Sequence, residues 1–190
     1  MKFLVVVDMQ NDFVDGSLGT KEAQSIVPNV VEKIKAAVSA GDQIFYTLDT
    51  HTPDYMNTAE GKKLPVPHCI EGTPGWELAP AVKAALDDAD TESVTMLTKP
   101  TFGSTLLTAH IEKQCRLWGT PDEIEFVGLC TGICVLSNAI LTKADFYEFN
   151  ITVDAACCAC VTPDSHETAL SAMELCQIDV KNRGMEPWKQ

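Results

Sequence analysis

Positive charge is scarce in this sequence of 190 residues. There are 14 lysines and arginines against 27 aspartates and glutamates, which gives a formal net charge of −13. Nucleic acids and anionic membranes are bound through basic patches, so the charge balance argues against both as partners. An acidic surface of this kind indicates good solvation more than any particular function.

Long apolar runs are also missing. The run after Met1 ends at Asp8, too soon for a signal peptide or a membrane-spanning helix, and no other segment reaches transmembrane length. The eight cysteines lie mostly in apolar segments, and without an export signal we expect them to be reduced thiols. Repeats, low-complexity tracts and interdomain linkers are absent. We therefore expect a single domain over residues 1–190, in the cytoplasm, with a core that needs no disulfide.

Strand patterns alternate with amphipathic helix patterns along the chain. Strands are predicted at 2–7, 43–48, 93–98, 124–129 and 150–156; helices at 26–40, 77–86, 104–114 and 163–175, with one more beginning near Cys134. Pro28 suits a first helical turn and Ser104 suits an N-cap. The polar tail from Asp179 to Gln190 is expected at the periphery. This order predicts an α/β fold, a doubly wound parallel sheet flanked by helices.

Reactive side chains follow the ends of four predicted strands. They are Asp8, Asp49 with His51, Lys99 and Cys134. Ligands of doubly wound sheets bind beyond the carboxyl ends of the strands, so the topology brings these positions to one edge of the sheet. Periodicity alone does not establish that the side chains touch.

Cys134 is a candidate nucleophile. It stands where the chain turns from strand into helix, two residues after Gly132. Unpaired N–H groups and the positive end of a helix dipole favour a thiolate there, and the N–H groups of the turn could bind an oxyanion. Taken alone, a cysteine of this kind is more often a small buried hydrophobic residue.

An amide hydrolysed by a cysteine also needs a proton acceptor and donor. Asp8 could serve as both in turn, and Lys99 could hold the Asp8 carboxylate and the thiolate by charge. The simpler interpretations are a loop-capping carboxylate and a solvated lysine. Only the common placement of these two residues with Cys134 favours catalysis.

The polar segment at 52–75 is long for a connection in a compact domain, which points to function or disorder. Four side chains of this segment and of the residues just before it, two carboxylates and two imidazoles, are candidate metal ligands. These groups suit Zn²⁺, Fe²⁺ or Mn²⁺, although Asp-x-His is a weak motif and surface histidines are common. The candidate ligands are Asp49, His51, Glu60 and His68.

A cysteine-based metal or redox site is the rival interpretation from another functional class. Cys157 and Cys160 form a Cys-x-x-Cys pair, and Cys130 with Cys134 forms a Cys-x-x-x-Cys pair. Buried thiols are the commoner explanation for such spacings in a strand. His166, on the last predicted helix, is expected to be structural.

Five segments in order resemble the isochorismatase-like cysteine hydrolases, and within them the nicotinamidases. The resemblance covers nearly the whole chain, and its strength lies in the order and spacing of the segments. The matching segments are Val6-Val-Asp-Met-Gln-Asn-Asp-Phe13, Asp49-Thr-His51, Pro67-His-Cys69 followed by Gly72-Thr-Pro-Gly75, Lys99-Pro-Thr-Phe-Gly-Ser104, and Gly128-Leu-Cys-Thr-Gly-Ile-Cys-Val135.

The resemblance implies a role for each matching residue. It implies Asp8, Lys99 and Cys134 as a catalytic triad, and a cis peptide between Leu129 and Cys130, with the N–H groups of Cys130 and Cys134 as the oxyanion hole. It also implies a divalent metal, zinc first and iron or manganese next, and a homo-oligomer. The implied metal ligands are Asp49, His51 and His68, with Glu60 as the fourth candidate; the implied substrate contacts are Phe13, Gln10, Phe102 and Leu129.

The sequence departs from the nicotinamidase pattern at three places. The usual third loop histidine is missing, with Asn57 and Glu60 as the nearby options and Glu60 the better ligand. The aromatic residue usual before Pro-x-His is replaced by Leu64 or Pro65, and Gly132 stands where an acidic residue is common. The prediction is an amidohydrolase that converts nicotinamide to nicotinate and ammonia through a cysteine thioester, a reaction of NAD salvage. The alternatives are hydrolysis of another small amide or carbamoyl compound, a silent family member, or a non-catalytic metal or redox protein.

Overall fold

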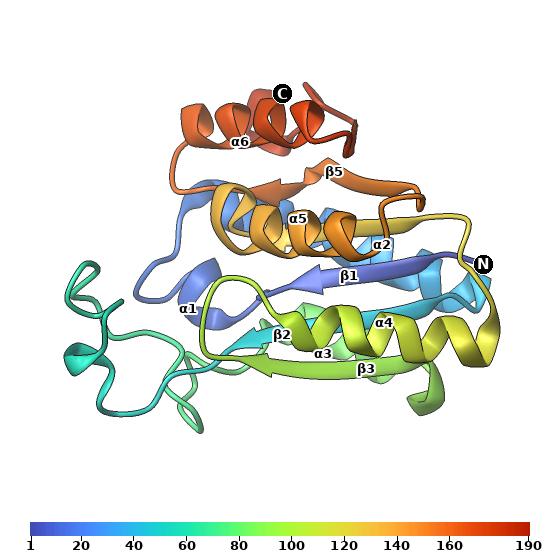
Figure 1. Cartoon of the computed structure of the whole chain (residues 1–190). Coiled ribbons are helices and arrows are strands. Elements are labelled where there is room, and N and C mark those ends of the chain that lie inside the picture. The colour runs from blue at the N-terminus through green and yellow to red at the C-terminus, as the bar shows by residue number, and fades with distance from the viewer.

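A six-stranded parallel sheet runs through the centre of the computed structural model, which describes residues 1–190 (Figure 1). The strand order is β3-β2-β1-β4-β5-β6, and all five neighbouring pairs are parallel. The chain starts in the middle of the sheet and winds outward in both directions. The strands are β1 Phe3–Val7, β2 Gln43–Asp49, β3 Val94–Lys99, β4 Ile124–Leu129, β5 Ile151–Ala159 and β6 Asp179–Lys181.

Helices cover both faces of the sheet, which confirms the predicted doubly wound α/β fold. Helices α2 and α3 pack on one face and α4, α5 and α6 on the other (Figure 1). A π-helix over Thr131–Val135 leads into α5, and short 3₁₀ turns occupy Tyr55–Asn57, Thr91–Ser93 and Pro187–Lys189. The α-helices are α1 Asn11–Val14, α2 Lys21–Ala40, α3 Pro80–Asp87, α4 Thr105–Trp118, α5 Leu136–Asp145 and α6 Pro163–Leu175.

Strand β1 reads as a continuous apolar run because both of its faces are buried. In β1, Leu4 and Val6 join the core under α2 and α3, whereas Phe3, Val5 and Val7 join the core under α4, α5 and α6. Successive side chains of a strand point to opposite faces, so one short run of five apolar residues supplies two cores. This arrangement fixes β1, and Asp8 directly after it, at the centre of the molecule.

Helix α2 begins five residues before the predicted start. The Thr20 hydroxyl accepts a hydrogen bond of 2.9 Å from the backbone N–H of Ala23 and caps the helix. Pro28 therefore lies in the helix interior, and its expected place in the first turn was wrong. It is tolerated because Pro28 and Gln24, whose carbonyl loses its partner, both lie on the exposed side of the helix. Ser104 does stand at the N-cap of α4, but its side chain makes no capping hydrogen bond.

The C-terminal segment is not peripheral, contrary to the expectation from its polarity. Asp179–Lys181 form β6, which pairs with β5. Farther on, Glu186 is fully buried and Trp188 packs against the core under α2. The segment contains few apolar residues, but it places one carboxylate and one indole inside the protein.

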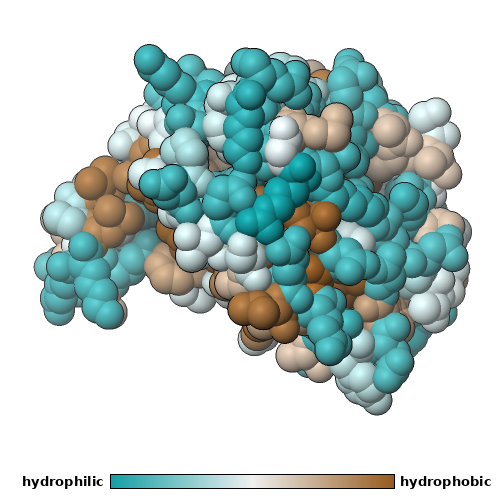
Figure 2. Space-filling view, turned by 90° about the horizontal axis from the view of Figure 1, so that it is seen from above, coloured by the Kyte–Doolittle hydropathy of each residue, from teal (hydrophilic) through white to brown (hydrophobic).

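The long connection after β2 lies beyond the carboxyl ends of the strands, at the left of Figure 1. His51 and Ile70 form an isolated bridge across it, so the connection is a closed loop that returns to the sheet. None of the helices combines the length and apolar character needed to cross a membrane. Seen from above, the surface is mostly hydrophilic, with groups of apolar residues at the left and in the middle of the view (Figure 2).

Candidate active site

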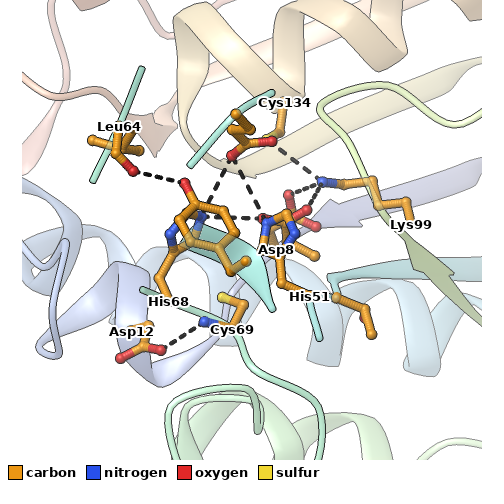
Figure 3. A network of polar contacts seen from close by, with 12 residues as sticks. Asp8, Asp12, His51, Leu64, His68, Cys69, Lys99 and Cys134 are labelled. Carbon is orange, nitrogen blue, oxygen red and sulfur yellow. Dashed lines mark hydrogen bonds and ion pairs between the residues drawn. The ribbon is translucent and has the colours of Figure 1, made fainter. Parts of the chain in front are cut away.

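Four predicted residues meet at the carboxyl edge of the sheet. Asp8, Asp49 and Lys99 lie at the ends of β1, β2 and β3, and Cys134 lies in the turn after β4. The Lys99 ammonium, at the end of β3, lies 2.6 Å from Asp8 Oδ2, 3.2 Å from Asp49 Oδ1 and 3.5 Å from Cys134 Sγ. Figure 3 shows Lys99 pointing toward Asp8 and Cys134 from one side of the site. Residues separated by up to 126 positions, from Asp8 to Cys134, thus share one cation.

Asp8 is held rigidly at the end of β1. It adopts a left-handed φ of 48°, which Asp tolerates better than most residues, and this turns its side chain toward Lys99. The Thr47 hydroxyl donates a hydrogen bond of 2.6 Å to Asp8 Oδ1. Asp8 is fully buried, and burial raises the pKa of its carboxyl although Lys99 opposes the shift. A carboxylate in this environment accepts a proton more readily than one in water.

Lys99 remains charged in spite of its burial. Burial lowers the pKa of an ammonium, but the carboxylates of Asp8 and Asp49 and the sulfur of Cys134 outweigh this effect and raise the pKa of Lys99. Its side chain has no exposed surface. A fixed positive charge therefore lies between the candidate base and the candidate nucleophile.

Cys134 lies in the π-helix before α5, close to the predicted helix start. Its thiol is buried, and burial together with the neighbouring Asp8 carboxylate raises the pKa of Cys134 well above its ordinary value, while Lys99 opposes the shift. The expectation that the helix end would favour a thiolate is therefore wrong for the free site. Desolvation and a like charge outweigh the helix dipole and the lysine, so the sulfur needs a base to become nucleophilic.

The backbone before Cys134 has two unusual features. The peptide bond between Leu129 and Cys130 is cis, as the resemblance implies. The backbone N–H of Cys130 donates to no other group of the protein, whereas its carbonyl accepts from Ile133 and Val135. Gly128 adopts a φ of 116° and approaches Val7 O so closely that a Cβ would lie 2.1 Å from it. Backbone contacts thus determine the conformation at the end of β4, and the N–H of Cys130 is free to bind an anion.

The four predicted metal ligands converge. Their ligand atoms all lie within 4.8 Å of one another. His51 Nε2 lies 3.0 Å from Asp49 Oδ2 and 3.8 Å from Glu60 Oε1, and His68 Nε2 lies 3.5 and 3.7 Å from the same two oxygens. His68 Nδ1 hydrogen-bonds to the carbonyl of Val66, which leaves Nε2 for a ligand. Asn57, the other option in the loop, is exposed and bonds to Asp54.

Asp12 anchors this loop, a role that sequence reasoning did not assign to it. Its carboxylate accepts a hydrogen bond of 2.7 Å from the N–H of Cys69, next to His68, as Figure 3 shows. A side chain at position 75 would collide with the same carboxylate, since a Cβ on Gly75 would lie 2.2 Å from it. A charged residue next to a predicted loop was the only available signal.

A cavity of about 250 Å³ opens beside Cys134 and the metal-ligand cluster. Three of the four residues expected to contact the substrate line it: Phe13, Phe102 and Leu129. Leu64 also lines it, where the resemblance leads one to expect an aromatic residue. Sequence reasoning did not assign the remaining wall to the substrate, because apolar and small residues at helix starts and strand ends carry no signal of a binding role. They are Leu18, Thr20, Ala23, Ile133, Cys160 and Val161.

Gln10, the fourth expected substrate contact, is not at the cavity. It is fully buried, and its amide nitrogen donates to the carbonyls of Asp49 and Trp76 at 2.9 and 2.8 Å. Its amide oxygen accepts from the N–H of Asp49 at 2.7 Å. Gln10 therefore fixes the backbone of a candidate metal ligand, and its hydrogen-bonding groups are already used.

The cysteines do not form a metal centre of their own. All eight are free, and neither group of potential ligands contains one. Cys157 and Cys158 lie inside β5, which runs three residues beyond the predicted end, and burial raises the pKa of both thiols. The Cys157–Cys160 spacing therefore reflects a buried strand and the buried residue directly after it.

Comparison with known proteins agrees with this geometry. Residues 2–182 match the isochorismatase domain. The chain belongs to the isochorismatase family.

Among its relatives is the nicotinamidase/pyrazinamidase of Mycobacterium tuberculosis, 25% identical over 95% of this chain and 98% of that protein. A probable inactive nicotinamidase of Arabidopsis thaliana is 26% identical over 98% of this chain and 94% of that protein. The crystal structure of the nicotinamidase/pyrazinamidase PncA from Bacillus subtilis superposes with a TM-score of 0.79 and 28% identity, covering 95% of this chain and 99% of that one. By these matches the chain is a nicotinamidase-like hydrolase of this family.

Proposed function

We propose that the protein hydrolyses nicotinamide to nicotinate and ammonia, using Cys134 as nucleophile and a divalent metal. The observation that carries the proposal is the position of Lys99. One buried ammonium contacts the candidate base Asp8, the nucleophile Cys134 and the metal ligand Asp49. Nucleophile, base and metal cluster are thereby parts of one site beside one cavity.

The first half of the reaction forms a thioester. The Asp8 carboxylate takes the proton of the Cys134 thiol, and the sulfur attacks the amide carbon. The N–H groups of Cys130 and Cys134 stabilise the negative oxygen of the tetrahedral intermediate, while Lys99 stabilises the thiolate before attack. Asp8 then donates its proton to the amide nitrogen, the C–N bond breaks, and ammonia leaves.

The second half releases the acid. Asp8, again a carboxylate, takes a proton from a water molecule that attacks the thioester carbon. The C–S bond breaks as the tetrahedral intermediate collapses, Asp8 returns the proton to Cys134, and the carboxylic acid leaves and loses its proton to solvent to become nicotinate. The raised pKa of Asp8 suits both directions of this transfer, since the group must accept and donate near neutral pH.

The residues present fit a divalent metal. Two imidazole nitrogens and two carboxylates can face one point, and borderline cations prefer such mixed nitrogen and oxygen ligands. Charge agrees as well, because the carboxylates of Asp8, Asp49 and Glu60 have a single lysine among them, Lys99, which pairs with Asp8 and Asp49. Asp49, His51, Glu60 and His68 would hold the ion. When bound, it would supply a Lewis acid for a ring nitrogen or a water; zinc is the first choice, with iron and manganese next.

The cavity favours a small, flat, uncharged substrate. Eleven of its 15 lining residues are hydrophobic, and the polar exceptions include the metal ligands at one side. A pyridine ring could lie against Phe13 with its nitrogen toward Asp49 and His68 and its carboxamide toward Cys134. We also propose a cytoplasmic location, which eight free thiols fit, and a homo-oligomer, as the family resemblance implies.

The test is ammonia release from nicotinamide by purified protein, with and without a chelator. We expect turnover that is lost on chelation and restored by zinc, iron or manganese. Cys134→Ala should lower kcat by at least about a thousandfold and leave the metal content unchanged, because the nucleophile is not a ligand. Retained hydrolysis in Cys134→Ala would overturn the mechanism.

The same assay separates the proposal from its rivals. Turnover of other small amides or carbamoyl compounds, but not of nicotinamide, would favour the second candidate function, to which Leu64 in place of an aromatic residue points. No turnover of any amide by metal-loaded protein would indicate a silent member of the family.

A further inference from the structure

A second cluster of titratable groups lies under α6, away from the cavity. The side chains of His166, Glu167 and Glu186 could offer three ligand atoms within 4.8 Å of one another. A metal is not needed there, because the Lys189 ammonium pairs with both Glu167 and Glu186. The cluster is already balanced by charge, so its role lies elsewhere.

His166 connects the C-terminal segment with the nucleophile turn. Its Nδ1 lies 2.8 Å from Thr131 Oγ1, and its Nε2 lies 3.3 Å from Glu186 Oε1. All three residues are fully buried. Trp188 packs edge-on against the imidazole at 5.3 Å, which limits the movement of the ring. The three side chains thus form one continuous buried path.

The chemistry of the partners fixes the direction of both hydrogen bonds. The pKa of Glu186 is lowered despite its burial, because Lys189 stabilises the carboxylate, so Glu186 can only accept. His166 Nε2 must then carry the proton. Burial lowers the pKa of His166, so the ring is neutral and Nδ1 is an acceptor. The Thr131 hydroxyl consequently donates to His166.

Thr131 is the first residue of the π-helix that carries Cys134, and it directly follows Cys130. The next residue packs as tightly against α6: a Cβ on Gly132 would lie 3.2 Å from Ala169 Cβ and 3.3 Å from Cys160 Sγ. The turn is therefore bound to α6 at two successive positions, one by a hydrogen bond and one by close packing. A small shift here moves the N–H groups of Cys130 and Cys134.

We propose that His166, held by Glu186, is a positioning residue that orients the turn from Cys130 to Cys134 through the Thr131 hydroxyl. The expected effect on the reaction rate rests on the proposed cysteine mechanism, whereas the orientation of the turn by His166 does not depend on it. The oxyanion hole depends on the placement of N–H groups to within a fraction of an ångström. The polar C-terminal segment thereby becomes part of the machinery that sets the reaction rate.

The experiment compares four variants of the full chain. Thr131→Val removes the hydroxyl at nearly constant shape, and His166→Phe keeps a ring but removes both hydrogen bonds. Thr131→Ser keeps the hydroxyl and removes only the methyl group. Thr142→Val is the matched control, since Thr142 is also fully buried but its hydroxyl has no hydrogen-bond partner. Ammonia release and hydrogen exchange of the 130–135 backbone are measured for each.

We expect Thr131→Val and His166→Phe to lower kcat by about 10- to 100-fold with KM changed less than about twofold, because the transition state is affected more than substrate binding. Thr131→Ser and Thr142→Val should stay within about threefold of the unchanged chain. Exchange at 130–135 should rise in the first two variants only. Equal kinetics in Thr131→Val and Thr142→Val, or unchanged exchange at 130–135, would overturn the proposal.

Failure of the proposed function gives a different result. If the unchanged chain releases no ammonia from any carboxamide, the proposed function fails, and exchange at 130–135 alone decides whether His166 holds the turn. If the unchanged chain is active and His166→Phe does not fold, Thr131→Val still provides the kinetic test.

Discussion

Two clusters of charged side chains occupy opposite ends of the same sheet. Toward the amino ends of the strands, Lys2, Lys33 and Lys181 pair with Glu123, Glu125 and Asp154. The three lysines there keep 26 to 52% of their side-chain surface exposed. Toward the carboxyl ends, the single lysine is Lys99, which has no exposed side-chain surface and pairs with Asp8 and Asp49, while the Glu60 carboxylate lies in the same ligand cluster as Asp49.

The difference lies in balance and burial. At the amino ends each carboxylate has a lysine of its own, so the cluster is satisfied without a ligand. At the carboxyl ends three carboxylates have one lysine among them, and a nucleophile and an apolar cavity lie next to them. Charged residues alone therefore do not identify a site. An unbalanced charge that is shielded from water does.

Replacing one lysine at each end should give the largest contrast. Lys99→Met removes the only cation among buried carboxylates and should cost about 3–5 kcal/mol of unfolding free energy. It should also lower kcat by at least about a hundredfold, because the thiolate loses its counterion. Lys33→Met should cost less, about 1–3 kcal/mol, because Glu125 keeps Lys181 and Asp154 keeps the hydrogen bonds of Ala156 and Asn182, and it should leave kcat unchanged.

Urea unfolding and ammonia release measure the two quantities. Similar losses of stability and activity in both variants would remove the distinction between the two clusters.

A milder change tests the surplus of negative charge. Glu60→Gln keeps the shape of the side chain but removes a charged ligand, so metal affinity should fall at least about tenfold, as even losses in the outer shell of a metal site have that effect. Glu71→Gln is the control, since Glu71 is an exposed carboxylate of the same loop. Calorimetric titration with zinc gives the dissociation constants of the two variants. Equal constants would exclude Glu60 as a ligand.

The smallest effect concerns pH. Burial lowers the pKa of His166 below its ordinary 6.5, despite the facing carboxylates of Glu186 and Glu167, while Lys189 lowers it further. The unfolded chain therefore binds this proton more readily. The stability contributed by neutral His166 is complete above pH 6.5 and is lost as the pH falls below it.

In His166→Phe this part of the pH dependence should disappear. Urea unfolding between pH 7.5 and 5.5, compared with the unchanged chain, isolates the effect, because His68 has a raised pKa and the opposite slope in both proteins. Identical slopes would show that folding does not shift the pKa of His166.

Much of the fold was predictable because its signals are local. Strand β4 and helix α6 have the predicted bounds, and a capping box at Thr162 and Ser165 starts α6. The start of α2 was misjudged because its first residues are polar, and tertiary packing of the later apolar face extends the helix backward. The C-terminal segment was misjudged for a related reason. Its few apolar and charged residues gain burial only from partners such as His166.

The candidate site divides in the same way. The positions of Asp8, Lys99 and Cys134 after strand ends were enough to predict that they would meet at one edge of the sheet. Glu60 was a candidate metal ligand only because it carries a carboxylate, and the closed loop brings it close to His51 and His68. Gln10, expected at the substrate, proved to be committed to the backbone of Asp49.

The sequence by itself determined the order of strands and helices, and with it the edge where reactive groups collect, because periodicity and chain connectivity are local properties. The tertiary structure decided the protonation of Cys134, the sharing of Lys99 among three groups and the connection from Glu186 to Thr131. Burial and electrostatic interaction depend on every atom nearby, whatever its distance along the chain.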